Sequence, residues 1–310
     1  MLGALIIDKP AGITSHDVVA RVRRVAGTRR VGHAGTLDPF ATGVLVVCVG
    51  RATRLVQFLV GLDKEYHATV RLGFATDTQD LSGKQIAPFK SSKETSLEEV
   101  RRVVSDFVGP QLQTPPMFSA KKVGGERLYK AAREGREIAR APVPITIHSV
   151  ELIETEDMLL RENADGTMDV GMAVRCSSGT YVRTLANDIG ERLGVGAHLA
   201  ALRRTAVGHF KIEQSVTLEA LENMPRDEAI ERALISSSAM LVHLPALTLD
   251  REGVSRVMTG RSIESPPPPG IEGEERFVRL CDESGALLAV GAYEAVTRLV
   301  KPRVVLDGKG

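Results

Sequence analysis

The chain contains no tryptophan among its 310 residues, and only 4% of them are aromatic. If it binds nucleic acid, stacking on bases must therefore depend on few rings. The three cysteines, Cys48, Cys176 and Cys281, are odd in number and far apart in sequence. This pattern argues against a disulfide framework or a zinc site and is typical of a reducing compartment, so we expect a cytoplasmic protein.

Long apolar runs are also absent. Residues 1–10 lack a basic start, and Asp8 interrupts their apolar run, so we expect no signal peptide. No other run approaches membrane-spanning length, and we expect no membrane association. The glycine-containing stretch 31–43 matches neither GxxxxGK[ST] nor GxGxxG, which excludes the two common phosphate-cradling loops there. We therefore expect no cofactor and no metal ion.

Neither sign of charge is in clear excess, since the formal net charge is +1. The distribution of charge is uneven, however. Residues 117–141 carry seven bases and three acids, whereas residues 151–169 carry seven acids and one base. Segregated charge can present one basic face to phosphates, although charge runs are more often solvated helix faces. The charge pattern alone leaves both interpretations open.

The composition is otherwise that of a globular protein, with 43% apolar and 25% charged residues. A chain of 310 residues is long for a single core, so we expect two domains. We place a first domain at residues 1–240, a linker over residues 235–246 and a small second domain at residues 247–310. About sixty residues make a small core, so the second domain should pack on the first.

The most informative stretch is residues 31–50. A polar, glycine-bent loop is followed by an apolar, β-branched run over residues 44–49, which predicts a buried strand. Asp38 is the only acid between residues 31 and 62, and Pro39 restricts its backbone to extended geometry. Such a loop can hold one reactive side chain over a cleft, but an aspartate in a turn more often caps backbone amides. Local chemistry leaves both roles open for Asp38.

Periodicity and capping residues predict further elements along the chain. We expect helices over residues 15–26, 51–59, 97–108 and 181–193, the last with Thr180 as its N-cap. Strands are expected over residues 2–7, 64–73, 144–154, 168–176, 277–281, 286–292 and 299–306. Residues 109–116 contain prolines and predict a loop, and residues 123–126 predict a tight turn.

Six stretches, in order along the chain, resemble motifs of the TruB family of tRNA pseudouridine synthases. They cover about residues 2–210, and six in the family's order are difficult to explain by chance. The stretches are LIIDKPAGITSHD (5–17), GHAGTLDPFATGVL (32–45), DKEYHATVRLG (63–73) followed by TDTQD (76–80), PPMFSAKKVGGERLYKAAREG (115–135), CSSGTYVRTLANDIG (176–190) and GAHLAALRRT (196–205).

The resemblance implies an α+β fold. The family has a central mixed, largely antiparallel sheet flanked by helices, with a small C-terminal PUA-like RNA-binding β-barrel. It also implies that the basic insertion at about residues 117–141 grips tRNA. The expected reaction is isomerisation of uridine 55 in the TΨC arm of tRNA to pseudouridine, by a monomer without an obligate protein partner.

The resemblance also implies roles for single residues. Asp38 would be the catalytic carboxylate, paired with Arg183, which would lower the Asp38 pKa. Tyr66 would stack on the target base, and it is the best candidate for the proton step. Asp38 could attack the base, attack C1′ of the ribose or remove a ribose proton. Without the resemblance, Tyr66 could be a core residue and Arg183 a surface arginine.

Other residues would shape or support the substrate site. His33 would pack against the nucleotide and help turn it out of the loop, although loop histidines more often satisfy hydrogen bonds. Tyr181 and Leu202 would shape the uracil pocket. Lys9, grouped with these substrate-site residues, would support the Asp38 loop, or it could be a plain turn lysine.

The expected contacts to RNA phosphates are all basic side chains. They are Arg29, Arg30, Lys121, Lys122, Arg127, Lys130, Arg133, Arg203 and Arg204. Residues 202–204 could alternatively form part of an amphipathic helix. Three other functions stay open: the catalytic subunit of an RNA-guided complex, a tRNA-folding chaperone, and a carboxylate glycosidase. The last would usually need two acids flanking the bond, and the motifs offer one acid matched with an arginine.

Overall fold

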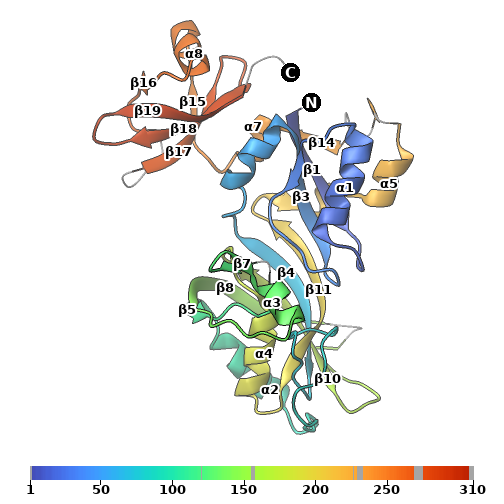
Figure 1. The fold of residues 1–310 in the computed structure, drawn as a ribbon. Coiled ribbons are helices and arrows are strands. Elements are labelled where there is room, and N and C mark those ends of the chain that lie inside the picture. The colour runs from blue at the N-terminus through green and yellow to red at the C-terminus, as the bar shows by residue number, and fades with distance from the viewer. Residues whose placement is uncertain are drawn as a thin grey trace.

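The computed structural model describes residues 2–306 apart from residues 120, 155–157, 226, 229–232 and 269–274 (Figure 1). Up to residue 240 the strands are β1 (Leu2–Lys9), β2 (Val31–His33), β3 (Thr42–Gly50), β4 (Lys64–Leu72), β5 (Gly109–Gln113), β6 (Lys122–Val123), β7 (Glu126–Arg127), β8 (Val143–Ile153), β9 (Leu160–Glu162), β10 (Met168–Cys176), β11 (Ala197–Val207), β12 (Phe210–Lys211), β13 (Val216–Thr217) and β14 (Leu234–Ser236). The helices there are α1 (Ser15–Ala26), α2 (Leu97–Ser105), α3 (Leu128–Arg133), α4 (Val182–Arg192), α5 (Leu218–Asn223) and α7 (Ser237–Met240), with 3-10 helices η1 (Arg51–Phe58) and η2 (Ile212–Gln214). The remainder contains β15 (Ala246–Thr248), α8 (Arg251–Met258), β16 (Ile263–Glu264), β17 (Glu275–Cys281), β18 (Leu287–Glu294) and β19 (Leu299–Val305).

One large mixed sheet organises the first part of the chain. Within the described residues it has twelve strands, with the main order β13-β1-β3-β11-β4-β10-β8-β5. Most neighbours along this path are antiparallel, and the pairs β1–β13 and β3–β11 are parallel. The predicted α+β class, with a mixed and largely antiparallel central sheet, is confirmed.

The two halves of this sheet meet at a short parallel contact between β3 and β11. Thr42 lies beside Arg203, and Gly43 lies beside Arg204. The contact joins an upper half built on β1 and β3 to a lower half built on β4, β8 and β10 (Figure 1). Gly43 has a φ of 100°, and a Cβ there would collide with the backbone of Arg204. Glycine at this position therefore allows the strands to approach.

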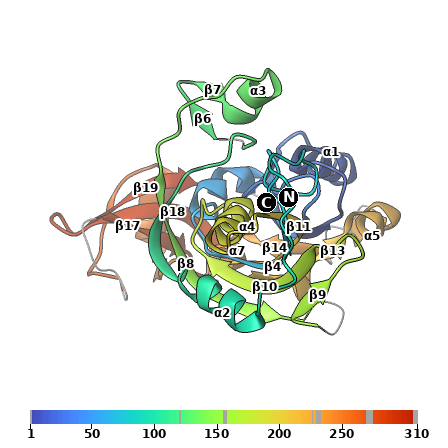
Figure 2. The ribbon, with the colours of Figure 1, turned by 90° about the horizontal axis from the view of Figure 1, so that it is seen from below.

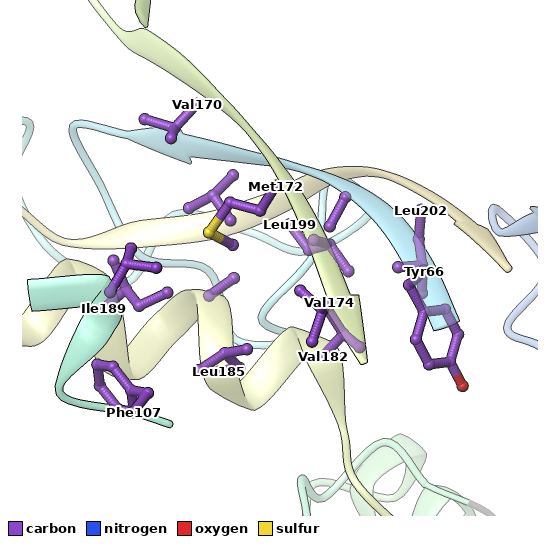
Figure 3. Packing of buried hydrophobic residues seen from close by; sticks show 14 of the residues in the cluster. Tyr66, Phe107, Val170, Met172, Val174, Val182, Leu185, Ile189, Leu199 and Leu202 are labelled. Carbon is purple, nitrogen blue, oxygen red and sulfur yellow. The ribbon is translucent and has the colours of Figure 1, made fainter. Parts of the chain in front are cut away.

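Both faces of β3 are covered, which explains its continuous apolar run. From Val44 onward, even-numbered residues pack against η1 and the C-terminal sheet, and odd-numbered residues pack against α1 and α5. In the lower half, α2 and α4 cover one face of the sheet. Figure 3 shows Leu185 and Ile189 of α4 beneath Met172 and Leu199, with Tyr66 at the margin of this cluster.

The C-terminal part forms a separate five-stranded sheet, with the order β15-β17-β18-β19-β16, that curls into a half-barrel. It packs on the first part, as predicted. The Arg54 guanidinium donates a hydrogen bond to the Val305 carbonyl over 2.7 Å, and the rings of Phe58 and Phe277 meet edge to face at 4.9 Å. The three predicted strands are present, and α8 is an addition that the sequence reading missed.

The basic insertion projects from the body of the molecule (Figure 2). Strands β6 and β7 form a hairpin whose turn residues, Gly124 and Gly125, have φ values of 59° and 87°. Two positive φ angles in a two-residue hairpin turn favour glycine, so the predicted tight turn is confirmed. Helix α3 follows the hairpin directly.

Several local predictions are wrong. Residues 109–113 form strand β5 instead of a loop. Pro110 is tolerated because β5 is an edge strand that, among the strands the structure describes, pairs with β8 alone. Ile235 lies in β14, which pairs with β1, and α7 follows, so the connection between the two parts begins after Met240. Residues 202–204 lie on β11, which removes the helical alternative.

Helix α2 also ends earlier than predicted, at Ser105, although Ser96 caps it by accepting a hydrogen bond from the Glu99 amide. Thr180 does not cap α4. The N-cap residue is Tyr181, and its amide donates to the side chain of Gln113 on β5 over 2.8 Å. Among the helices that the structure describes, none has the length and apolar character needed to cross a membrane.

Candidate active site

The loop that carries Asp38 joins β2 to β3 and is held from several sides. The Ser15 hydroxyl, at the start of α1, accepts a hydrogen bond from the Leu37 amide over 2.9 Å. The Gly12 amide donates to the Pro39 carbonyl over 2.8 Å. Lys9 donates to the carbonyls of Pro39 and Ala41 at 3.2 and 2.7 Å. These bonds fix the backbone on both sides of Asp38.

Arg183, in the first turn of α4, meets Asp38 across the cleft. Its Nε lies 2.9 Å from Asp38 Oδ2, and its Nη2 donates to Asp38 Oδ1 over 3.3 Å. Such fork-like pairing fixes the orientation of the carboxylate as well as its charge. A positive side chain in the first turn of a helix is repelled by the positive end of the helix dipole, and the Asp38 carboxylate offsets this repulsion. The ion pair expected between these residues is present.

Further acceptors complete the surroundings of Arg183, whose side chain is only 4% exposed. The guanidinium donates to the carbonyls of Thr78 and Phe118 at 2.9 and 2.8 Å. Its Nη1 also lies 3.5 Å from Oδ2 of Asp80. The carboxylates of Asp38 and Asp80 therefore flank one guanidinium. Since Phe118 belongs to the basic insertion, that insertion is tied directly to the site.

The pKa of Asp38 differs from the expectation based on Arg183 alone. Burial raises the pKa of the Asp38 carboxyl above its ordinary value, and the nearby charge of Asp80 raises it further. The charge and hydrogen bond of Arg183 act in the opposite, lowering direction. The predicted lowering effect of Arg183 is therefore confirmed. The net shift is upward, because burial and the second acid act against the arginine.

A cavity of about 270 Å³ lies over this ion pair. Asp38, Tyr66, Tyr181, Arg183 and Leu202 all line it. Ligand cavities usually measure roughly 300–1,000 Å³, so this one is suited to a small group such as a single base. Figure 3 shows Tyr66 and Leu202 side by side on β4 and β11, with the Tyr66 hydroxyl directed away from the apolar cluster.

Tyr66 is 8% exposed and offers a flat apolar surface at the cavity. Burial raises the pKa of its phenol, although the charge of Arg204 and a hydrogen bond from it act in the lowering direction. The phenol therefore keeps its proton at neutral pH. This arrangement favours stacking and hydrogen bonding by Tyr66 over a role as an ionised base.

Two residues grouped with the substrate site, Lys9 and His33, do not line this cavity. Lys9 is fully buried, and its hydrogen bonds within the described residues go to the carbonyls of Pro10, Pro39 and Ala41. These bonds support the Asp38 loop, as expected, and the burial of Lys9 keeps its side chain away from the cavity. His33 is likewise not among the lining residues. Its ring stands edge-on to that of His16 at 5.6 Å, and burial lowers its pKa to about 4.

The expectation that Arg204 faces an RNA phosphate is wrong. Its side chain is 1% exposed and donates to the carbonyls of Gly35, Thr36 and Val44. Alternation along β11 turns Arg203 to the other face of the sheet, where it pairs with Asp8 at 2.8 Å. Arg203 keeps 42% of its side chain exposed, and its position leaves contact with RNA open.

The other expected phosphate contacts lie on the surface. Arg29 and Arg30 are exposed beside the N-terminal end of β2. In the insertion, Lys122 and Lys130 are exposed and Lys121 is half-buried, and none of the three pairs with an acid in the described part of the chain. The side chains of Arg127 and Arg133 lie outside the described residues.

Sequence reasoning missed three residues at the site. Asp80 is the last residue of TDTQD (76–80), the stretch that follows the strand motif at residues 63–73. Its position in that motif was the one signal in the sequence that it could lie at the site. Lys64 precedes Tyr66 on β4 and lines the cavity. Gln113 holds both the amide and the carbonyl of Tyr181, and no local pattern indicated this. Within the described ranges, no group of His, Cys, Asp and Glu side chains is arranged to hold a metal ion.

Two family models match adjacent parts of this chain. Residues 23–182 match the model of the TruB family pseudouridylate synthase N-terminal domain. Residues 183–242 match the model of the tRNA pseudouridylate synthase B C-terminal domain.

Curated relatives match over most of their length. A protein from Opitutus terrae is 48% identical over 233 residues, which are 75% of this chain and 92% of that protein. One from Bacillus pumilus is 39% identical over 306 residues, which are 98% of this chain and 97% of that protein. Both relatives are named tRNA pseudouridine synthase B.

Solved structures share the fold. One is described as an H/ACA RNP bound to a substrate RNA containing 2′-deoxyuridine. It aligns with a TM-score of 0.74 at 26% identity, over 98% of this chain and 84% of the other. A Cbf5-Nop10-Gar1 complex aligns with a TM-score of 0.74 at 27% identity, over 99% and 84%. The predicted pseudouridine-synthase fold is confirmed.

Proposed function

Because this chain belongs to the TruB family of pseudouridylate synthases, we propose that it isomerises uridine 55 in the TΨC loop of tRNA to pseudouridine, with Asp38 as the catalytic carboxylate. The observation that carries the proposal is the meeting of Asp38 and Arg183. They are 145 residues apart in sequence and share one base-sized cavity with Tyr66 and Leu202.

The reaction breaks the bond between N1 of uracil and C1′ of the ribose, rotates the base, and joins C5 to C1′. The proton leaves C5 and N1 gains one. Nothing is oxidised and no water is consumed, so the site has to supply binding, orientation and charge. The base must first leave the stack of the tRNA loop, at a cost of a few kcal/mol. Stacking on Tyr66 and contacts to the RNA backbone offset this cost.

Mapping of pseudouridine by mass spectrometry tests the proposal directly. Unmodified tRNA transcript incubated with the purified protein alone should gain pseudouridine at position 55 and at no other uridine. Modification at a different position would show that the target is another uridine. A transcript that stays unmodified would contradict the proposed function.

The structural likeness to H/ACA complexes supports a second candidate, the catalytic subunit of an RNA-guided complex. The two functions differ in their requirements. Activity on free transcript without a guide RNA or another protein favours the stand-alone enzyme. The relatives from Opitutus terrae and Bacillus pumilus, both named tRNA pseudouridine synthase B, match at 48% and 39% identity, against 26–27% for the complexes, which supports the first candidate.

Turnover should fall as the solution becomes acidic. The fall should begin at a higher pH than it would if an aspartate with an ordinary pKa controlled the rate. The carboxylate form of Asp38 is required, and burial and Asp80 raise its pKa above the ordinary value of about 3.9. As the pH falls through this raised pKa, the carboxylate gains a proton and activity is lost. The measurement is the pH dependence of the single-turnover rate.

The variant Asp80→Asn provides the matched comparison. Removing the Asp80 charge lowers the Asp38 pKa, so the acidic limb of the rate profile should move to lower pH. An acidic limb that stays at the same pH, or moves to higher pH, would show that Asp38 does not control the pH dependence of the rate.

We propose that the insertion binds the backbone of the tRNA. Changing Lys121, Lys122 and Lys130 to alanine together should weaken binding and reduce the slope of log Kd against log salt. Each lost phosphate contact removes about 0.7–0.9 from the magnitude of this slope, so the triple variant should lose about 2–3. Equilibrium binding at several salt concentrations measures it.

A surface control comes from α2, which lies on the opposite side of the body from the insertion in Figure 2. Arg101 and Arg102 are both exposed there, and changing them to alanine should leave the slope unchanged. If the α2 variant loses as much slope as the insertion variant, the RNA surface lies elsewhere.

A further inference from the structure

Three buried cations surround the Asp38 loop, and their side chains are bonded to backbone carbonyls. Lys9 and Arg204 are 0% and 1% exposed, and Lys64 is 7% exposed. The Lys64 ammonium donates to the carbonyls of Val60 and Leu62 at 2.7 and 2.5 Å. Arg204 donates to Val44 over 2.8 Å and to Gly35 over 3.1 Å.

None of these three cations forms a salt bridge with a carboxylate in the part of the chain that the structure describes. The two acids at the site, Asp38 and Asp80, both lie against Arg183. Charge on the buried side of the cavity is therefore positive in excess. Burying a cation without an anion is unfavourable, so this arrangement needs an explanation.

Two of the three cations reach the substrate cavity. Arg204 and Lys64 line it, whereas Lys9 does not. Burial and then the charge of Arg204 lower the pKa of Lys64 to about 8, so Lys64 still carries its proton at neutral pH. The cavity wall thus carries two fixed positive groups, and within the described residues neither of them forms a salt bridge with a carboxylate.

The proposed reaction supplies an anion at this place. When the bond between N1 and C1′ breaks, its electron pair stays on the base, and negative charge spreads over N1, O2 and O4 of uracil. The ribose C1′ becomes electron-poor until C5 supplies a new electron pair. When C5 supplies that pair, the base is neutral again. The proton then leaves C5 and a proton is added at N1, so the product is an isomer of the substrate. A route in which Asp38 first adds to the ring also places negative charge on the base.

We infer that Arg204, assisted by Lys64, stabilises the negative charge that uracil acquires between breakage of the old bond and formation of the new one. Positive groups fixed before the reaction stabilise developing charge more effectively than mobile water, because they need no reorganisation. This role goes beyond loop support by Arg204, and it rests on the proposed function.

The test compares two RNA substrates in single turnover, a T-arm hairpin with uridine at the target and the same hairpin with 5-fluorouridine. Fluorine withdraws electrons, so the base anion needs less help from the protein. Arg204→Met should slow loss of uridine by about a hundredfold and loss of 5-fluorouridine by about tenfold or less. Affinity for either hairpin should change little.

Lys9→Met is the matched control, because Lys9 is a buried cation bonded to the same loop but outside the cavity. Lys9→Met should slow loss of uridine and loss of 5-fluorouridine by the same factor. Equal defects for Arg204→Met as well, or none, would overturn the inference and leave Arg204 with a structural role. If Arg204→Met does not fold, Lys64→Met decides by the same comparison. Wild-type protein that modifies neither hairpin would instead count against the proposed function.

Discussion

Asp38→Asn is expected to abolish pseudouridine formation while leaving tRNA affinity nearly unchanged. Asparagine has the same shape and can still accept a hydrogen bond from Arg183, so the cavity should keep its form. What is lost is the negative charge and the nucleophilic or basic oxygen. Removing such a group should reduce the single-turnover rate by more than about a thousandfold.

The measurements are the single-turnover rate with excess enzyme and the equilibrium Kd for the same tRNA. Asp106→Asn serves as a control, since Asp106 is exposed on the surface and pairs with Arg192 at 3.5 Å. That control should turn over like the wild type. Substantial turnover by Asp38→Asn would remove Asp38 from its proposed role, whatever happens to binding.

Arg183→Met should have the second-largest effect, because it damages both stability and chemistry. The change leaves the carboxylates of Asp38 and Asp80 close together without their shared cation. It also leaves the carbonyls of Thr78 and Phe118 without a donor. Breaking a buried pair in this way costs about 3–5 kcal/mol of unfolding free energy, which urea denaturation can measure.

The chemical consequence of Arg183→Met follows from the pKa of Asp38. Arg183 lowers that pKa, so its removal should raise the pKa further and move the acidic limb of the rate profile to higher pH. Arg183→Lys restores the charge but not the fork that reaches several acceptors, so stability should recover more than turnover. An Arg183→Met variant with wild-type rate and an unmoved acidic limb would contradict this account.

Much of the local structure was predictable because it depends on neighbouring residues. The apolar run of β3 indicated a buried strand. Alternation of apolar and polar residues along β4 indicated that Tyr66 lies on the buried face of that strand. The adjacent glycines at 124 and 125 indicated the hairpin turn. These signals are local sterics and periodicity, which a sequence displays directly.

Contacts between distant segments were not predictable from such signals. The parallel contact of β3 with β11 joins residues about 160 positions apart, and only Gly43 hints at it. Gln113 on β5 holds the backbone of Tyr181, the N-cap residue of α4, whereas a rule that looks only at adjacent residues chose Thr180. Pro110 suggested a loop because sequence does not distinguish an edge strand from an irregular segment.

At the site, the motifs predicted which residues gather but not how charge is distributed. Asp38, Tyr66, Tyr181, Arg183 and Leu202 share one cavity, as the resemblance implied. The shift in the Asp38 pKa depends on burial and on Asp80, which only the folded chain brings together. Likewise, Arg203 and Arg204 were both expected to face RNA, yet strand alternation buries Arg204 and exposes Arg203.

A crystal structure of Asp38→Asn bound to a T-arm hairpin would test directly whether this cavity receives the target base. We expect the nucleotide corresponding to uridine 55 to have left the loop stack. Its uracil should lie in the cavity against Tyr66 and Leu202, with its ribose beside Asn at position 38. A bound hairpin whose target base stays stacked in the loop, with the cavity between Tyr66 and Arg183 empty of RNA, would contradict this expectation.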